Sequence, residues 1–282
     1  MCAEPLNGAP LLEVRDLRKH YPLRSVLGTR AGEVKAVDGI SFTLHEGECY
    51  GLVGESGCGK TTTGRLLQGL IEPTGGTIEF RGEPVASLSR AGLRRYRSDV
   101  QMIFQDPYSS LNPRKRVGRI LAEALKIQGA TAGRDIRARV VDALEAVGLS
   151  EEHFNRYPHE FSGGQRQRIG IARALMVSPR LIICDEPVSA LDVSIQAQIL
   201  NLLRRLQRDL GLTYLFISHD LSVVRYVADR VGVMHRGELV EEGLAKEIFT
   251  KPQHPYTKAL LAAVPVRHPA HRRHHRTLEE TA

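Results

Sequence analysis

The stretch Gly54-Glu55-Ser56-Gly57-Cys58-Gly59-Lys60-Thr61 lies between a short apolar segment, residues 49–53, and a segment with helical character, residues 61–70. It fits the spacing GxxxxGK[ST], in which glycines allow backbone amides to curl around phosphate groups at the N-terminus of a helix. In that arrangement Lys60 neutralises the β- and γ-phosphates and Thr61 ligates Mg²⁺. An ordinary glycine-rich turn is the alternative, and the strand-loop-helix context argues against it. The sequence therefore predicts a nucleotide-binding loop made of Gly54, Glu55, Ser56, Gly57, Cys58, Gly59, Lys60, Thr61 and Thr62.

Two adjacent carboxylates follow a second apolar strand, residues 181–184. The carboxyl ends of parallel strands are the edge of a sheet where ligands gather. We therefore expect Asp185 to hold Mg²⁺ through a water molecule, and Glu186 to orient or deprotonate an attacking water. Alone, such a strand end is more often a capped or solvated turn. The phosphate loop upstream favours the catalytic interpretation.

The composition of the 282 residues excludes several other classes of protein. With 42% hydrophobic and 25% charged residues the chain is typical of a soluble globular protein. Its longest apolar runs have only a few residues, whereas a membrane-spanning helix needs about 20. The four cysteines show no CxxC spacing, so neither a zinc site nor a disulfide framework is predicted. The N-terminus lacks the features of a secretory signal, which indicates a cytoplasmic location.

The net charge of +7 raises the question of a nucleic-acid partner. Much of this charge comes from arginine-rich stretches, which are more often solvated faces. No RNA-binding aromatic motif accompanies them, and the chain has no tryptophan. We therefore expect no nucleic acid among its partners.

The order of apolar patterns predicts the fold. Residues 11–18 and 33–44 indicate an antiparallel β-sheet, because Ile40, Phe42 and Leu44 alternate with polar residues. The middle of the chain is helix-rich, and after it strands alternate with helices, which indicates a parallel sheet covered on both faces. The elements expected there are helices at 117–128, 135–147 and 193–209, with Asp192 as the N-cap of the last, and strands at 181–184, 212–217 and 231–234.

Together these patterns predict an α/β fold, a phosphate-loop NTPase core with a mostly parallel sheet, an N-terminal antiparallel β-subdomain and a helical insertion. We expect a flexible N-terminus at residues 1–10, one ATPase domain at 11–250 with the helical subdomain at about 107–176, and a C-terminal extension with a basic tail at 251–282. His268, His271, His274 and His275, which stand among arginines, are interpreted as part of a solvated segment.

Further motifs bring the sequence to a family. In the order of the chain they are Phe104-Gln105-Asp106-Pro107, Phe161-Ser162-Gly163-Gly164-Gln165, Ser189-Ala190-Leu191-Asp192 and Ser218-His219-Asp220. With the phosphate loop and the paired carboxylates, these motifs resemble those of ATP-binding cassette (ABC) proteins over nearly the whole chain. The resemblance implies the fold of an ABC nucleotide-binding domain, ATP and Mg²⁺ as cofactors, and ATP hydrolysis as the activity.

The resemblance also implies that two cassettes face each other head to tail around two ATP molecules. The chain has one copy of each motif, so it needs a second ABC ATPase subunit, in a heterodimer or a homodimer. Residues that contact the partner's ATP would be Ser162, Gly163, Gly164 and Gln165, where a helix N-terminus favours an anion. Asp192 would take part in communication across the dimer. Taken alone, Ser-Gly-Gly is also a common flexible linker.

Further roles follow from the same resemblance. Gln105 would sense the γ-phosphate through Mg²⁺ and mark the hinge to the helical insertion. His219 would hydrogen-bond the γ-phosphate and position Glu186, so that Lys60, Gln105, Glu186 and His219 form the catalytic set, with Thr61, Gln105 and Asp185 at the metal. Tyr21 would place its ring against adenine. Cys58, inside the loop, predicts sensitivity of the ATPase to thiol reagents.

Within the family the sequence resembles the F-type ATP-binding subunit of dipeptide and oligopeptide importers. The segments that carry this resemblance are residues 104–114, 157–160 before the SGGQ segment, and His254-Pro255-Tyr256-Thr257-Lys258-Ala259-Leu260-Leu261. It implies two transmembrane permease subunits as partners, indirectly an extracytoplasmic solute-binding protein, and a place on the inner face of the cell membrane. An importer of nickel or glutathione, an exporter subunit and a non-transport cassette protein are the alternatives.

Overall fold

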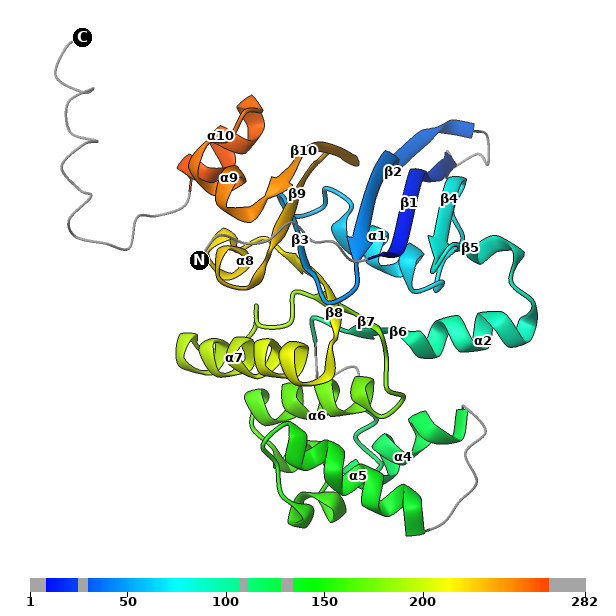
Figure 1. The fold of residues 1–282 in the computed structure, drawn as a ribbon, viewed down its shortest axis with the longest axis vertical. Helices are drawn as coiled ribbons and strands as arrows, with labels where there is room; N and C mark the ends of the chain where they lie inside the picture. The colour runs from blue at the N-terminus through cyan, green and yellow to red at the C-terminus, as the bar shows by residue number, and fades with distance from the viewer. Residues whose placement is uncertain (1–8, 25–29, 107–110, 128–133, 264–282) are drawn as a thin grey trace, which may run out of the picture.

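The computed structural model describes residues 9–24, 30–106, 111–127 and 134–263. Its strands form two sheets, which Figure 1 shows above a group of helices. One sheet has the order β10-β9-β3-β8-β7-β6 and the other has the order β2-β1-β4-β5. The strands are β1 (Pro10–Arg24), β2 (Arg30–His45), β3 (Cys49–Val53), β4 (Gly75–Phe80), β5 (Glu83–Pro84), β6 (Val100–Ile103), β7 (Leu181–Asp185), β8 (Thr213–Ser218), β9 (Arg230–His235) and β10 (Glu238–Leu244).

The α-helices connect and cover these sheets. They are α1 (Lys60–Leu67), α2 (Arg90–Asp99), α4 (Val117–Ile127), α5 (Arg134–Ala146), α6 (Gly163–Leu175), α7 (Val193–Leu210), α8 (Leu221–Val227), α9 (Ala245–Thr250) and α10 (Pro255–Ala262), with 3-10 helices at Val85–Ser87, Glu151–Asn155 and Pro158–Glu160. The predicted α/β class is confirmed, because β3, β6, β7, β8 and β9 pair in parallel and the N-terminal sheet is antiparallel.

Each face of the six-stranded sheet belongs to a different hydrophobic cluster. Along β7, Leu181 and Ile183 pack with α1 and the antiparallel sheet, whereas Ile182 and Cys184 pack with the helices on the opposite side. Successive side chains of a strand point to opposite faces, so a strand that is buried on both faces must be apolar throughout. This explains why β3, β7 and β8 lack the alternation of polar residues seen in β2.

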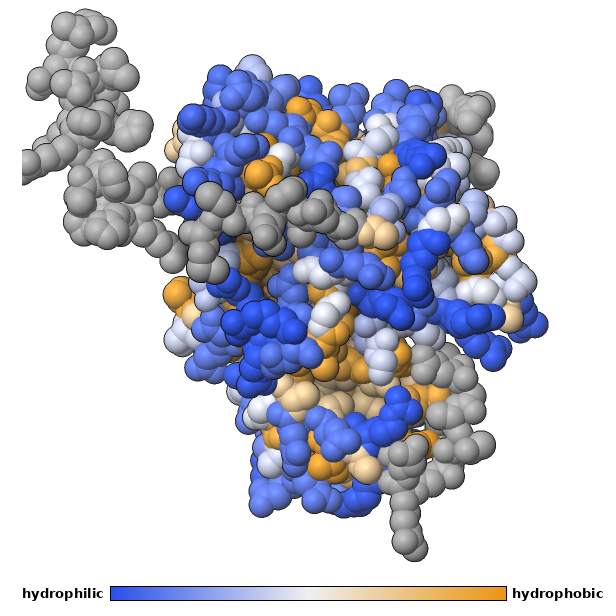
Figure 2. Space-filling view, in the orientation of Figure 1, coloured by the Kyte–Doolittle hydropathy of each residue, from blue (hydrophilic) through white to orange (hydrophobic). Residues whose placement is uncertain are grey.

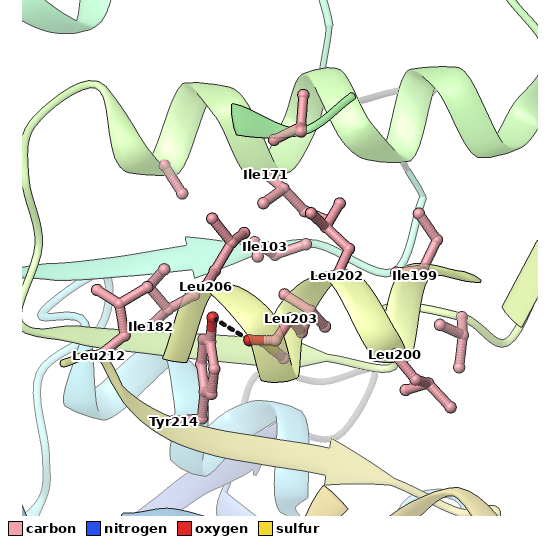
Figure 3. Packing of buried hydrophobic residues seen from close by; sticks show 14 of the residues in the cluster. Ile103, Ile171, Ile182, Ile199, Leu200, Leu202, Leu203, Leu206, Leu212 and Tyr214 are labelled. Atoms are coloured by element: carbon pink, nitrogen blue, oxygen red, sulfur yellow. Dashed lines mark hydrogen bonds between the residues drawn. The ribbon is translucent and has the colours of Figure 1, made fainter. Parts of the chain in front are cut away.

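Helix α7 shows how the lower face is covered. Figure 3 shows Leu203 and Leu206 of this helix beside Ile182 and Tyr214 of the sheet. The Tyr214 hydroxyl donates a 3.1 Å hydrogen bond to the Leu203 carbonyl oxygen, which satisfies the one polar atom of a buried ring. Truncating a leucine buried at such a position to alanine costs about 2–5 kcal/mol of stability. This packing holds α7 against the first residues of β7 and β8.

The predicted helices at 117–128, 135–147 and 193–209 each agree with α4, α5 and α7 to within one residue at either end. Helix α1 ends at Leu67, three residues earlier than predicted. The reason is a glycine stop signal, in which Gly69 adopts a φ of +69° and Leu70 N donates to Arg65 O at 2.9 Å. At the start of α7, Asp192 occupies the predicted N-cap position, but its side chain makes no capping hydrogen bond.

Helices α4, α5 and α6 contact one another and form the lower part of the molecule in Figure 1. Figure 2 shows that hydrophilic side chains cover most of the visible face, while apolar side chains gather in a band above α4 and α5. Among the described residues, no helix has both the length and the apolar content needed to cross a membrane.

Candidate active site

The glycine-rich loop leaves the buried strand β3 and ends where α1 begins at Lys60. Its first glycine is required by packing as well as by backbone shape. A Cβ atom on Gly54 would lie 2.2 Å from the carbonyl oxygen of Met234, and its φ of +152° falls in the region that favours glycine. The loop is therefore pressed against the end of β9, which fixes its path into α1.

Lys60 folds its side chain back across the loop and is only 5% exposed. Its ammonium group donates 2.8 Å hydrogen bonds to the carbonyl oxygens of Gly54 and Glu55. The third N–H of the ammonium group is directed at Cys58 Sγ at 3.7 Å, a weak acceptor that an anion would replace. The predicted lysine is thus held at the centre of the loop.

The hydroxyl group of Thr61 donates a 2.9 Å hydrogen bond to the carboxylate of Asp185, the last residue of β7. The Asp185 side chain is buried, and burial raises its pKa, as the nearby Glu186 carboxylate does more weakly, while the hydrogen bond from Thr61 opposes the shift. A buried carboxylate beside a hydroxyl supplies the hard oxygen ligands that Mg²⁺ prefers. Two of the three predicted metal-ligating residues, Thr61 and Asp185, are therefore brought together, and their chemistry fits that ion.

Glu186 is held at both carboxylate oxygens. Gln105 Nε2 donates to Oε2 at 2.9 Å, and His219 Nδ1 lies 2.9 Å from Oε1. An ionised carboxylate only accepts hydrogen bonds, so Nδ1 of His219 carries the proton. Gln105 follows β6 and His219 follows β8, and both therefore reach Glu186 from the strands that flank β7.

Lys60, Thr61, Gln105, Glu186 and His219 line one cavity of about 630 Å³, a volume usual for a small-molecule site. Of the predicted loop and strand-end residues, Gly54, Glu55, Cys58 and Asp185 are not among those that line it. Sequence reasoning missed the contribution of β2 and of the turn between β9 and β10, which no motif marks. The cavity is lined by Val34, Lys35, Ala36, Ser56, Gly57, Gly59, Lys60, Thr61, Thr62, Gln105, Glu186, His219, Arg236 and Gly237.

Tyr21 lies beside this cavity and does not line it. It pairs across β1 and β2 with Val34, which does line it, and directly paired residues point to the same face of a sheet. The Tyr21 side chain is exposed, and Lys19 Nζ lies 5.1 Å from the centre of its ring. Its contact with adenine remains a prediction.

The SGGQ segment begins α6 and lies outside the lining of the cavity. Gln165 N donates to Ser162 Oγ at 3.3 Å, and Ser162 N donates to Gln165 Oε1 at 3.0 Å, which forms a capping box. A Cβ atom on Gly164 would lie 2.5 Å from Ile195 of α7, so that close approach requires glycine. The segment is a rigid helix start rather than a flexible linker.

The structure argues against the expected thiol sensitivity at Cys58. Its side chain is only 6% exposed, and burial raises the pKa of the thiol, although Lys60 opposes that shift. The thiolate is the reactive form of cysteine, so a buried thiol with a raised pKa reacts slowly. The loop shape places the Cys58 side chain inward, which the sequence alone does not show.

The geometry defines a class of protein, a phosphate-loop ATPase with paired carboxylates at the end of β7, which β8 separates from β3 in the sheet. The sequence profile described as ABC transporter matches residues 37–189. The profile described as oligopeptide/dipeptide transporter, C-terminal region, matches residues 240–282. The chain belongs to the ABC transporter family, as an ATP-binding and ATP-hydrolysing subunit.

Two curated relatives from Bacillus subtilis align with nearly the whole chain. It is 55% identical to the oligopeptide transport ATP-binding protein AppF over 262 residues, which are 92% of this chain and 80% of AppF. It is 56% identical to OppF, with the same description, over 265 residues, or 93% of this chain and 85% of OppF. The glutathione import ATP-binding protein GsiA of Escherichia coli is 55% identical over 274 residues, which are 97% of this chain and 44% of GsiA.

Solved structures agree with the fold. The cbiO1 protein from Clostridium perfringens, part of the ABC transporter complex cbiONQ, superposes with a TM-score of 0.73 at 30% identity, covering 86% of this chain and 91% of cbiO1. The ATP-binding cassette MJ0796, in a dimeric post-hydrolysis state bound to ADP and Pi, gives 0.72 at 28% identity, covering 83% of this chain and 98% of MJ0796.

Proposed function

We propose that Glu186 is the catalytic base of this ATPase, and that hydrolysis of MgATP in a head-to-tail pair of cassettes drives the uptake of di- or oligopeptides. The observation that carries the catalytic part is the pair of 2.9 Å contacts on Glu186, from Gln105 and from His219. They fix both oxygens of the carboxylate at the edge of the cavity that also holds Lys60 and Thr61. A base held in this way is positioned before the reaction begins.

In the proposed reaction, Glu186 accepts a proton from water as the water oxygen attacks the γ-phosphorus and ADP leaves. The products are ADP and inorganic phosphate, and the proton on Glu186 returns to solvent. Lys60 neutralises charge on the phosphates, which accounts for much of the catalysis in phosphoryl transfer. His219 uses Nδ1–H for Glu186, so a hydrogen bond from Nε2 to the γ-phosphate would require a second proton on the ring, as in the imidazolium form.

Mg²⁺ would be held by Thr61, Asp185 and Gln105. Gln105 uses its amide nitrogen for Glu186, which leaves its amide oxygen for the ion. When bound, the ion supplies charge neutralisation at the phosphate oxygens.

A second cassette is proposed because the SGGQ segment does not line the cavity of its own chain. In a head-to-tail pair, Ser162, Gly163, Gly164 and Gln165 would close over the nucleotide of the partner, and Asp192 would take part in communication between the two sites. The partner is a second ABC ATPase subunit, different from this chain or identical to it.

The substrate class is supported by the profile matched at residues 240–282 and by the descriptions of AppF and OppF. We infer that two permease subunits receive the cassettes on the inner face of the membrane, and that an extracytoplasmic binding protein delivers the peptide. A glutathione importer is the second candidate, because GsiA is equally similar in sequence.

The experiment is ATP hydrolysis by the assembled transporter in proteoliposomes, with the binding protein loaded with a tripeptide, with glutathione or left empty. We expect stimulation by the tripeptide. Stimulation by glutathione alone would assign the chain to the second candidate, and stimulation by neither would contradict peptide import.

Lys60→Ala tests the loop in the same preparation. We expect turnover to fall by at least about 10²-fold, because a group that stabilises transition-state charge contributes on that scale. Lys246→Ala, which removes an exposed lysine of α9 outside the cavity lining, is the matched control and should hydrolyse ATP normally. Unchanged turnover by Lys60→Ala at saturating ATP would refute the loop assignment.

A further inference from the structure

Helix α10, in the region matched by the oligopeptide transporter profile, contacts the phosphate loop directly. The backbone N–H of Glu55 donates a 3.2 Å hydrogen bond to the hydroxyl oxygen of Tyr256. We propose that Tyr256 is a positioning residue for the phosphate loop, through which the C-terminal region sets the affinity of the site for nucleotide. This inference rests on the loop being the nucleotide site.

The contact reaches Lys60 through one rigid peptide unit. A trans peptide is planar, so the N–H of Glu55 and the carbonyl of Gly54 point in opposite directions from the same plane. Tyr256 binds the N–H side, and Lys60 Nζ donates to the Gly54 oxygen on the other side at 2.8 Å. Rotation of this peptide would move the acceptor that holds the lysine ammonium. The tyrosine hydroxyl therefore fixes the orientation of the peptide on which Lys60 rests.

The ring of Tyr256 is held firmly enough to act in this way. It stacks on His235, the last residue of β9, with ring centres 4.0 Å apart. The start of α10 is held by Glu241 of β10, whose two carboxylate oxygens accept from Gln253 N at 2.7 Å and His254 N at 3.0 Å. His254 Nδ1 in turn accepts from Tyr256 N at 3.2 Å.

These contacts explain the His-Pro-Tyr sequence at this point. The histidine caps the helix, Pro255 occupies its first turn, where a missing N–H is harmless, and the tyrosine reaches the loop. The turn after β9 makes a second contact with the phosphate loop, since Gly237 N donates a hydrogen bond to Cys58 O at 3.0 Å. Residues from the C-terminal part of the chain, Tyr256 and Gly237, thus hold the outer side of the phosphate loop, which comes much earlier in the sequence.

The test is Tyr256→Phe, which keeps the stacked ring and removes only the acceptor. We expect the Kd for MgATP and for MgADP to rise about 3- to 10-fold, the scale of one hydrogen bond, while kcat at saturating ATP stays within about twofold. Tyr226→Phe is the matched control, because it removes a hydroxyl that donates to Asn201, outside the cavity lining. Its Kd should equal that of the unmodified protein.

A second variant separates positioning from folding. Glu241→Gln removes one of the two acceptors at the start of α10 and should weaken binding in the same direction. If Glu241 acts through Tyr256, the double variant should bind no more weakly than Tyr256→Phe alone. The melting temperature of each nucleotide-free variant should stay near that of the unmodified protein, because the hydrogen bond is exposed.

The proposal is overturned if Tyr256→Phe binds both nucleotides within twofold of the unmodified protein, or if Tyr226→Phe weakens binding equally. Lys60→Ala in the same titration distinguishes this failure from that of the site itself. Loss of binding in Lys60→Ala with none in Tyr256→Phe overturns only the positioning role. Normal binding by Lys60→Ala overturns the loop assignment and the inference together.

Discussion

Glu186 has an unusual backbone conformation, and both oxygens of its carboxylate make hydrogen bonds. Its φ is +48°, which is uncommon for a residue with a side chain and costs about 1–3 kcal/mol. The surrounding bonds hold it there, including Glu186 N to Ile217 O at 2.9 Å. Such strain is found where a reacting group must be aimed, and here it turns the carboxylate toward Gln105 and His219.

We predict that Glu186→Gln gives an assembly that binds ATP and closes but does not hydrolyse. The substitution keeps the size of the side chain and removes the carboxylate that accepts a proton. Turnover should fall by about 10²–10⁴-fold, and nucleotide affinity should hold or rise because a negative charge near the γ-phosphate is lost.

Single-turnover hydrolysis and size-exclusion chromatography in MgATP measure these two effects. In a heterodimer the partner's site should be inactivated as well, since its turnover would hide the loss. Near-normal hydrolysis would rule out Glu186 as the base, and loss of ATP binding would assign it a structural or metal-binding role.

Asp185→Asn should separate stability from function. The pKa of Asp185 is raised in the folded protein, chiefly by burial, so its ionised form is less favourable there than in the unfolded chain. This cost in folding free energy is absent at pH values below the pKa of Asp185 in the unfolded chain, because the group is then protonated in both states. It is complete at pH values above the pKa of Asp185 in the folded protein. At neutral pH, asparagine removes it and still accepts from Thr61, so the melting temperature of the nucleotide-free protein should rise.

The same variant should lose the advantage that Mg²⁺ gives to nucleotide binding, because asparagine supplies no charge to the ion. Titration of ATP with and without Mg²⁺, together with thermal melting near pH 7, gives both readouts. A lower melting temperature in the nucleotide-free state would contradict the stated effect of burial on Asp185.

At the scale of elements, the start of α6 carries the proposed contact with the partner cassette. Ser162→Arg should leave ATP binding by this chain intact and prevent closure, because it places a long side chain where the partner's γ-phosphate must dock. The substitution also removes a helix cap, which costs about 0.5–2 kcal/mol.

Ser162→Ala is the control for that loss, since it removes the cap without adding bulk. We expect ATP-dependent dimerisation, measured by size exclusion, to fail with arginine and to remain at least in part with alanine. Dimerisation by the arginine variant would contradict the shared-site arrangement.

Local sequence patterns predicted those helices and strands whose apolar spacing and bordering glycines identify them without reference to the rest of the fold. The strand-loop-helix unit around Lys60, the strand before Asp185 and helices α4, α5 and α7 follow from apolar spacing and glycine positions. Helices α2, α8, α9 and α10 and strands β4, β5, β6 and β10 were not predicted. Several are short or partly exposed, so that their stability comes from tertiary packing more than from their own sequence.

The contacts of the site were predictable only in part. That Gln105 and His219 both reach Glu186 depends on β6 and β8 flanking β7, an order that no single segment encodes. The role of Gln105 implied by resemblance was to sense the γ-phosphate through Mg²⁺ and water, and its hydrogen bond to Glu186 was not foreseen. The partnership of Glu55 with Tyr256 joins residues 201 positions apart, which no local pattern can indicate.

For the whole molecule, the segment 104–116 is proposed as the rim of the groove that receives a cytoplasmic helix of the permease. Residues 107–110 lie outside the described residues. The flanking Phe104 and Asn112 line a cavity of about 660 Å³ that is shared with α2 and α4, including Leu93 and Ile120. A groove with apolar walls and polar edges suits an amphipathic helix.

We predict that a cysteine at Asn112 cross-links to cysteines in a cytoplasmic helix of the permease. A cysteine at Gln198, on the outer side of α7, is the control and should not cross-link. Cys49, Cys58 and Cys184 are buried and need no replacement, whereas Cys2 should be changed to serine. Absence of any cross-link across a scan of the permease helix would count against this groove.

The contacts that hold the phosphate loop against the C-terminal part of the chain have a consequence for synthesis of the protein. Gly54 packs on Met234 and Glu55 on Tyr256, so the loop leaves the ribosome long before the residues that shape it. Contacts between distant positions also form slowly, because a long loop of chain must close first. A nascent chain that ends after α7 therefore carries the phosphate-loop sequence without its final shape. Nascent chains arrested after α7 should not be retained on ATP-agarose, whereas chains long enough to expose α10 should be retained. Retention of both kinds of chain would show that the N-terminal part shapes the loop unaided. The phosphate loop thus reaches its final shape only after β9 and α10 have been translated.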